Sequence, residues 1–152
     1  MINREQIVAE ALSWVGTPYH PRAMVKLAGC DCATFILGVF RNCGLVLERG
    51  HAEAGDWFCH TQEDRYFAKA LRHGRLVAEG IGYASLAAQP GDIVLTHHQR
   101  SVRVYNHGGI VVKWPSIVHS VYPRVELADA TKHWMWGFHQ TAVLDPYEVP
   151  VA

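Results

Sequence analysis

The sequence contains little cysteine, and its cysteines do not form a metal-binding or disulfide pattern. Four occur in 152 residues, all in the first half of the chain: Cys30, Cys32, Cys43 and Cys59. A scaffold held together by disulfides is therefore not expected. One residue rather than two separates Cys30 from Cys32, and no second pair follows, which argues against a redox motif and structural zinc. We expect neither a metal nor another cofactor.

The chain also lacks a long apolar run and an excess of charge of either sign. Fourteen Lys and Arg residues balance fourteen Asp and Glu residues, so binding of nucleic acid is not indicated. No stretch approaches the roughly 18 apolar residues of a membrane-spanning helix. The start, MINREQIVAEALSW, is too charged for a secretory signal. We expect synthesis in the cytoplasm, no membrane insertion, and a single domain over residues 1–152.

Two helices are predicted in the first third of the chain. Residues 3–14 carry apolar side chains at helical spacing. Asp31 is placed to cap a second helix over residues 32–43, because a side-chain oxygen before the first turn accepts backbone N–H bonds. Gly44 follows the predicted end of this helix. The helix is apolar along one side, so we expect it to be buried there.

The second half of the chain is typical of strands. QPGDIVLT has a Pro-Gly turn before a β-rich run, and three later stretches are strand-like; these segments are residues 89–96, 107–114, 116–127 and 133–144. Helices followed by strands predict an α+β fold, with the helix that begins at Cys32 packed on an antiparallel sheet. Residues 48–88 are mixed and polar, with one predicted helix over residues 61–73.

Cys32 is the strongest candidate for chemistry. Unpaired N–H groups and the dipole at a helix N-terminus favour a thiolate, which makes a first-turn cysteine a better nucleophile. The alternative interpretation is a packed core residue, because free cysteine is commonly buried. That alternative suits Cys30, Cys43 and Cys59 better.

A nucleophilic thiol needs an imidazole that takes its proton and later delivers it to the leaving amine. His107 stands at the start of an apolar strand, and His119 lies on the strand predicted to pair with it. Because side chains alternate across a strand, the register decides whether the two rings meet. A three-residue turn over residues 113–115 pairs Gly109 with His119 and puts the histidines on one face, with Cβ atoms roughly 5 to 8 Å apart. A two-residue turn puts them on opposite faces. On one face, His119 would orient His107 and fix its tautomer.

Other polar and aromatic residues are interpreted as structural. The histidines in polar or irregular surroundings are expected at the surface; they include His20, His51, His73 and His133. Three aromatic residues near the C-terminus are expected to pack on the sheet, with an assembly surface as the alternative: Trp134, Trp136 and Phe138.

Taken in order, these motifs resemble the NlpC/P60 family of cysteine peptidases, which has a papain-like fold. The matching segments are GTPY (16–19), DCATF (31–35), PGDIVL (90–95), HGGIVV (107–112) and IVHS (117–120). The resemblance implies that Cys32 is the nucleophile, His107 the general base and acid, and His119 the orienting residue. It also implies that Tyr19 binds substrate or stabilises the oxyanion, and that Asp31 recognises a free amine of the substrate.

The sequence departs from the family pattern in two places. Ala33 and Thr34 replace the commoner Ser-Gly after the cysteine, which bears on the substrate contacts made there. The polar stretch over residues 96–106 is longer and more basic than the usual lead into the histidine.

The resemblance also implies a substrate and a site of action. The family hydrolyses the bond between γ-D-glutamyl and a diamino acid in peptidoglycan stem peptides, through a thioester and without metal. Short members encoded among tail genes of phages and gene transfer agents are most similar. They imply a phage-like tail as carrier, tail-tip or baseplate proteins as partners, and action in the periplasm or cell wall of a recipient cell.

Two alternatives remain open. One is a structural tail plug or binding module that keeps the peptidase fold. The other is an acyltransferase or amidase that forms a thioester, although in such relatives the histidine usually precedes the cysteine.

Overall fold

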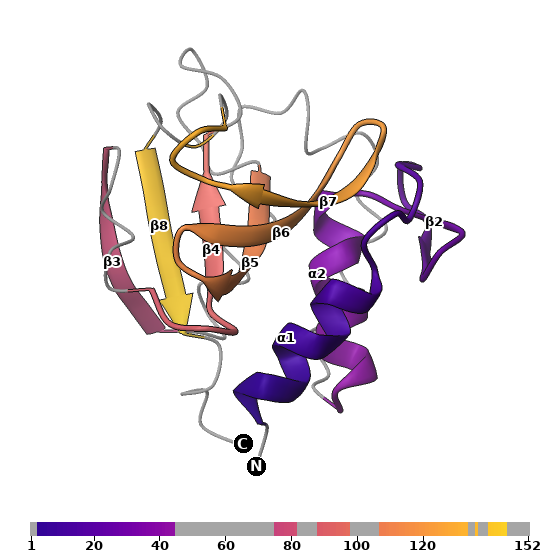
Figure 1. Cartoon of the computed structure of the whole chain (residues 1–152), viewed down its shortest axis with the longest axis horizontal. Helices are drawn as coiled ribbons and strands as arrows, with labels where there is room; N and C mark the ends of the chain where they lie inside the picture. The colour runs from indigo at the N-terminus through magenta and orange to yellow at the C-terminus, as the bar shows by residue number, and fades with distance from the viewer. Residues whose placement is uncertain are drawn as a thin grey trace.

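A computed structural model describes residues 3–44, 75–81, 88–97, 107–133, 136 and 140–145 (Figure 1). In chain order its elements are α1 (Arg4–Ser13), β1 (Met24–Val25), β2 (Gly29–Cys30), α2 (Cys32–Asn42), β3 (Arg75–Ile81), β4 (Ile93–Thr96), β5 (His107–Lys113), β6 (Ser116–Val121), β7 (Arg124–Asp129) and β8 (Gln140–Asp145). The helix predicted over residues 61–73 lies outside the described residues. Among those described, no helix combines the length and apolarity needed to cross a membrane.

The main sheet confirms the predicted α+β architecture. Its strand order is β3-β8-β4-β5-β6-β7, and every neighbouring pair is antiparallel. Strand β3 was not predicted, because RLVAEGI mixes apolar residues with charge and glycine, and only pairing with β8 fixes it as a strand. The run over residues 116–127 is two strands rather than one, since the chain turns at Tyr122 and Pro123.

Helix α2 begins where the sequence predicts, because Asp31 satisfies its first N–H groups. The Asp31 Oδ1 atom accepts bonds from the backbone N–H of Ala33 at 3.0 Å and of Thr34 at 2.9 Å, and the Thr34 hydroxyl accepts the Asp31 N–H at 2.8 Å. This reciprocal arrangement is a capping box. The residues from Cys32 to Phe40 are buried.

Both helices lie on one side of the main sheet (Figure 1). Their packing depends on Gly38, where an added Cβ would lie 2.5 Å from an indole carbon of Trp14. A mid-helix glycine costs about 1 kcal/mol, and here it makes room for the Trp14 ring. The main core fills the space between helices and sheet, with Ile110 and Val118 on the helix side. A second cluster, containing Val111, Ile117 and Trp136, covers the opposite side.

The segment after α1 extends the sheet beyond β7. The Gly16 N–H donates to the Val125 carbonyl at 2.9 Å, the Val125 N–H donates to Thr17 at 2.9 Å, and the Tyr19 N–H donates to Pro123 at 2.9 Å. Tyr19 also forms a bridge to Cys30. These bonds fix the chain that leads into α2 beside β7.

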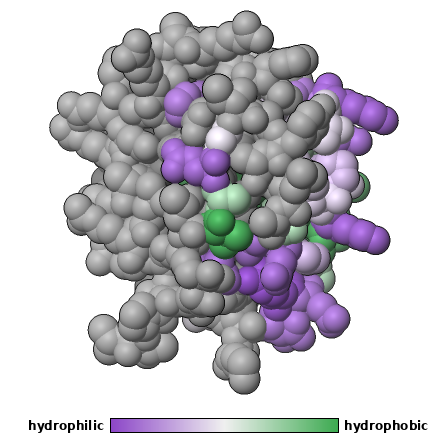
Figure 2. Space-filling model, turned by 90° about the vertical axis from the view of Figure 1, so that its left-hand side faces the viewer, coloured by the Kyte–Doolittle hydropathy of each residue, from purple (hydrophilic) through white to green (hydrophobic). Residues whose placement is uncertain are grey.

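The surface on the side of β3 is mainly hydrophilic where residues are described. In that view hydrophilic side chains border a small hydrophobic area, and further hydrophobic atoms lie at one edge (Figure 2). Within the described part of this side, a broad apolar surface is therefore not seen.

Candidate active site

The two histidines singled out in the sequence meet across β5 and β6. The Nε2 atom of His107 lies 2.9 Å from the Nδ1 atom of His119, and the ring centroids are 5.1 Å apart. His107 is 3% exposed and His119 is 0% exposed. A buried imidazole pair at this distance shares a hydrogen bond, so each ring fixes the tautomer of the other.

The register at this pair is the predicted one, but the turn that produces it is not. Ile110 pairs with Val118 and Val111 with Ile117, in line with the expected pairing of Gly109 and His119. Lys113, however, pairs with Ser116, and the register shifts between Val111 and Lys113. The turn therefore has two residues, and a bulge supplies the odd residue that the prediction assigned to the turn.

Gly109 allows the close approach of the two strands. A Cβ at this position would lie 2.9 Å from the Val118 carbonyl oxygen and 3.2 Å from the Cβ of His119. Both distances are too short for unstrained packing. The absence of a side chain at Gly109 is thus part of how His119 is placed.

Glu126 extends the pair and was missed by sequence reasoning. It faces His119 directly across β6 and β7, and its Oε1 atom lies 2.9 Å from the Nε2 atom of His119. The signal that could have found it is the turn at Tyr122 and Pro123, which makes residues 119 and 126 cross-strand partners. Without that turn the stretch reads as one continuous strand.

The Glu126 carboxylate determines where the protons lie. An ionised carboxylate only accepts hydrogen bonds, so His119 donates from Nε2 and keeps a lone pair on Nδ1. That lone pair accepts the Nε2–H of His107. In neutral His107 the proton-accepting nitrogen is then Nδ1, which does not face His119. Burial lowers the pKa of His119 to about 4, which keeps this ring neutral at neutral pH.

His133 and Trp136 complete the surroundings. The Nε2 atom of His133 lies 3.3 Å from Glu126 Oε1, and its ring lies 4.8 Å from that of His119. His133, expected at the surface, is half-buried, with 17% of its side chain exposed. Trp136 is buried as expected and packs 5.6 Å from the ring of His107, although it lies in a turn rather than a strand. Trp134 and Phe138 lie outside the described residues.

Cys32 begins the helix that packs against β5 and β6. It is fully buried and shares the helix-side core with Ile110 and Val118. The chain just before it contacts the residue after His119: the Ser120 hydroxyl donates to the Cys30 carbonyl at 3.4 Å. The start of α2 therefore lies beside the histidine-bearing part of β6.

The side-chain alternation sets how the thiol approaches an imidazole. His107 and His119 alternate with Ile110 and Val118, so they lie on the sheet face that carries Trp136, away from α2. His107 is the first residue of β5. An approach of the Cys32 thiol to the His107 ring would therefore have to pass the beginning of β5 rather than cross the sheet.

The remaining cysteines agree with a structural interpretation where they are described. Cys30 is fully buried, and burial raises the pKa of its thiol to about 11. Cys43 is half-buried, and burial likewise raises the pKa of its thiol. Cys59 lies outside the described residues.

Asp31 and Tyr19 flank the start of α2. Asp31 is 1% exposed, and its Oδ2 atom accepts the Arg22 N–H at 2.7 Å while Oδ1 caps the helix. Tyr19 is half-buried, with its ring edge-on to Tyr122 at 6.3 Å. The structure gives Asp31 a capping role; the substrate contacts of both residues stay predictions.

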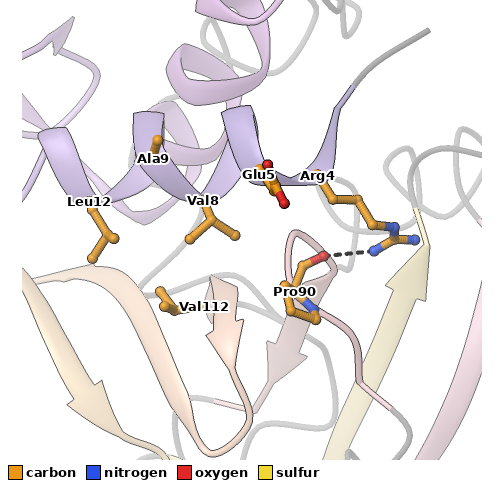
Figure 3. A pocket seen from close by; sticks show the side chains of 7 residues that line it. All are labelled: Arg4, Glu5, Val8, Ala9, Leu12, Pro90 and Val112. Carbon is orange, nitrogen blue, oxygen red and sulfur yellow. Dashed lines mark hydrogen bonds between the residues drawn. The ribbon is translucent and has the colours of Figure 1, made fainter.

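A separate apolar cavity lies between α1 and the sheet (Figure 3). It has a volume of about 460 Å³ and is lined by Arg4, Glu5, Val8, Ala9, Leu12, Pro90 and Val112. Its edge is fixed by Arg4, which donates to the Pro90 carbonyl at 2.9 Å and pairs with Asp92 at 2.7 Å. None of the candidate catalytic residues lines it.

Comparison with solved structures identifies the fold. No protein-family model and no curated protein sequence matches the chain. The NlpC/P60 domain of the peptidoglycan hydrolase SagA superposes with a TM-score of 0.60 and 20% identity, over 93% of this chain and 98% of that domain. NlpC1 from Trichomonas vaginalis gives a TM-score of 0.67 at 18% identity, over 95% of this chain and 44% of that one. An NlpC/P60 family protein from Bacillus cereus gives 0.61 at 14% identity, over 92% and 39%.

The chain therefore has the papain-like fold of NlpC/P60 domains, as predicted. At these identities the likeness concerns the fold. The chain spans less than half the length of the second and third of these proteins.

Proposed function

We propose that the protein is a cysteine endopeptidase that cleaves peptidoglycan stem peptides. In this proposal Cys32 is the nucleophile, His107 is the general base and acid, and His119 and Glu126 are positioning residues. The observation that carries it is the 2.9 Å contact between His107 Nε2 and His119 Nδ1. With Glu126 behind it, this contact leaves Nδ1 as the basic nitrogen of His107. A histidine at the surface would not need a buried partner that fixes its tautomer.

The reaction has two halves. His107 Nδ1 takes the Cys32 proton as Sγ attacks the carbonyl carbon of the scissile bond, and the resulting imidazolium returns that proton to the leaving amine. The products of this half are a thioester and a free amine. In the second half His107 takes a proton from water, and the water oxygen forms a bond to the carbonyl carbon of the thioester. The carbon–sulfur bond then breaks, and His107 returns the proton to the sulfur of Cys32.

The start of α2 supplies electrostatic stabilisation. The backbone N–H of Cys32 is a candidate oxyanion donor, and the helix dipole favours negative charge on sulfur and oxygen. We assign Tyr19 to the same function or to substrate binding. Asp31, which caps the helix, is assigned to the free amine of the substrate through its charge.

The proposal extends to the bond that is cleaved and to the place where the protein acts. Resemblance to the family supports the bond between γ-D-glutamyl and a diamino acid. The fold shared with a peptidoglycan hydrolase domain supports the substrate class. We further propose delivery by a phage-like or gene transfer agent tail, which rests on the resemblance alone. Mass spectrometry of purified particles from the producing cells tests it, and absence of the protein from them would refute it.

Digestion of purified peptidoglycan tests the activity. The protein should release stem-peptide fragments that mass spectrometry identifies, and Cys32→Ala should release none. Cys30→Ala is the matched control and should remain active, because burial raises the pKa of the Cys30 thiol to about 11 and so keeps it protonated at neutral pH. Equal cleavage by Cys32→Ala would remove this residue from the mechanism.

The same experiment separates the alternatives. Absence of cleavage by the unaltered, folded protein would favour the structural plug or binding module. A product that carries a new amide or ester bond, formed when an acceptor amine or alcohol is added, would favour acyl transfer. The order of the chain, with Cys32 before His107, favours the peptidase over that last alternative.

A further inference from the structure

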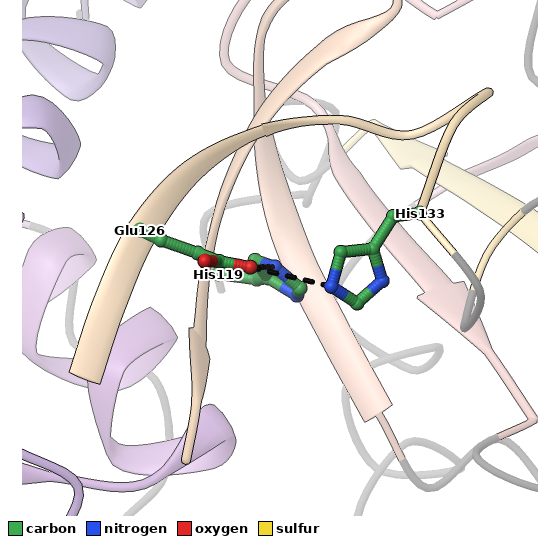
Figure 4. A group of neighbouring side chains, drawn as sticks. All are labelled: His119, Glu126 and His133. Atoms are coloured by element: carbon green, nitrogen blue, oxygen red, sulfur yellow. Dashed lines mark hydrogen bonds and ion pairs between the residues drawn. The ribbon is translucent and has the colours of Figure 1, made fainter. Parts of the chain in front are cut away.

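Three potential metal ligands converge behind the proposed catalytic pair: His119, Glu126 and His133 (Figure 4). We propose that they bind a divalent transition metal of the zinc class, and that the bound metal switches off His107 as a base. The first part of this proposal, metal binding, depends only on the geometry of these three residues. The regulatory half rests on the proposed function.

The geometry fits a small tetrahedral ion. The three ligand atoms all lie within 4.8 Å of one another. His119 Nε2 and His133 Nε2 lie 2.9 and 3.3 Å from the same carboxylate oxygen, Glu126 Oε1. Zinc bonds of about 2.0 to 2.1 Å place ligands roughly 3.3 Å apart in a tetrahedron. The two pairs that include Glu126 already lie near this spacing, and the two histidine nitrogens, which are at most 4.8 Å apart, would have to move closer together.

The fold holds the ligands on ordered backbone while keeping a route from solvent. His119 and Glu126 are direct partners across β6 and β7. His133 follows β7 in a turn, where its N–H donates to the Asp129 carbonyl at 3.1 Å. The Glu126 side chain is 42% exposed and that of His133 is 17% exposed, whereas the side chain of His119 is 0% exposed. An ion can thus enter from the Glu126 side and reach the buried ring.

The ligand set selects the metal class. Two imidazoles and one carboxylate suit zinc and its neighbours, whereas calcium and magnesium prefer oxygen ligands. A fourth position would be taken by water. The tautomer of His119 requires only Glu126, so the approach of His133 to the same oxygen is not explained by the peptidase mechanism.

Metal binding would reverse both tautomers. The metal takes the Nε2 lone pair of His119, so the proton of this neutral ring moves to Nδ1. That Nδ1–H then points at His107 Nε2, which must present its own lone pair, and the proton of His107 moves to Nδ1. Two protons shift within the pair and none is lost. His107 no longer offers a lone pair on the nitrogen that would take the Cys32 proton.

Calorimetry with Zn²⁺ tests the binding half. Titrating Cys32→Ala, which removes the thiol as a competing ligand, should show one site. Adding His133→Gln to that variant should weaken binding at least tenfold, and adding His20→Gln, at an exposed histidine outside the cluster, should not. Equal affinity in both double variants would overturn the site.

Co²⁺ spectra of the unaltered protein locate the ion independently. We expect ligand-field bands from nitrogen and oxygen ligands without a thiolate-to-cobalt charge-transfer band. A charge-transfer band that disappears in Cys32→Ala would place the metal on the thiol and overturn the proposal.

Peptidoglycan digestion tests the regulatory half. Each variant is compared with itself, in EDTA and in Zn²⁺, so that any change in basal rate cancels. His133→Gln should need at least tenfold more Zn²⁺ for half inhibition than the unaltered protein or His20→Gln. An equal requirement in all three would overturn the switch. Inactivity of the unaltered protein in EDTA would refute the proposed function instead, while calorimetry would still decide the site.

Discussion

His119 and Glu126 face each other directly across β6 and β7, with 2.9 Å between Nε2 and Oε1. This contact fixes which ring nitrogen carries the proton in His119 and, through it, in His107. It makes the basicity of His107 depend on a side chain that His107 does not touch.

Replacing Glu126 should change activity according to the hydrogen-bonding character of the new side chain. Glu126→Gln keeps an acceptor oxygen and should retain most of the kcat. Glu126→Ala should lower the kcat about tenfold, and Glu126→Lys, which only donates, should lower it about a hundredfold or more by imposing the opposite tautomers. Nitrogen NMR shifts of the two imidazoles report the tautomers directly. Equal kcat in the Ala and Lys variants, with unchanged tautomers, would contradict the positioning role.

Gly109→Ala should impair both stability and activity. The new Cβ would meet the Val118 carbonyl at 2.9 Å and the His119 Cβ at 3.2 Å, and such overpacking costs about 1 to 3 kcal/mol of the free energy of unfolding. Urea denaturation measures the first effect and peptidoglycan digestion the second.

Gly44→Ala is the control for that variant. Its φ of +88° makes an alanine strained, by about 1 to 2 kcal/mol, but nothing lies within 4 Å of the added Cβ. We expect a comparable loss of stability with normal activity at a temperature where both variants are folded. Loss of activity in both would indicate a general effect rather than displacement of His119.

Cys30 and Cys32 should differ in reactivity toward iodoacetamide. With a pKa of about 11, the Cys30 thiol is ionised in about one molecule in a thousand at pH 8. Both cysteines are fully buried, so the expected difference comes from ionisation alone. Tandem mass spectrometry of the peptide that carries both should find the label on Cys32 before Cys30 while the protein is folded, and on both after denaturation. Preferential labelling of Cys30 in the folded protein would be incompatible with the proposed nucleophile.

Stability should fall as the pH is lowered, through the linkage of His119. Burial lowers the pKa of this ring from 6.5 to about 4, so below pH 6.5 the unfolded chain binds a proton that the folded chain does not. The resulting loss begins near pH 6.5, is complete near pH 4, and amounts to at most about 3 kcal/mol. Urea denaturation in EDTA measures it. His119→Asn should show a shallower pH dependence, and identical slopes would exclude this residue as the cause.

The helix that carries Cys32 could be predicted because its signals are local. Asp31 precedes a run of apolar residues and Gly44 follows it. The capping residue, the helical spacing of apolar residues and the residue that ends the helix therefore all lie within 14 residues. The joint face of His107 and His119 was predicted only on the assumption of a three-residue turn, because alternation along one strand is a short-range rule but the offset between two strands is not.

Other parts of the site depend on pairing that the sequence does not specify. A two-residue turn with a bulge gives the same offset as a three-residue turn, so the hairpin after β5 could not be resolved. Glu126 and His133 join the site only because the chain reverses at Tyr122 and Pro123. Strand β3 exists only through β8, which follows it by more than 50 residues.

Because of the bulge at Val112, the number of residues between His107 and His119 determines which face of the sheet His119 lies on. Natural selection should therefore act on this number as well as on the identity of the residues. Deleting one of them would turn His119 toward the helices, although every side chain of the site would still be encoded. Substitutions at Lys113 leave that count intact, whereas insertions do not. Descendants of this gene should therefore vary the composition of the hairpin and preserve its length.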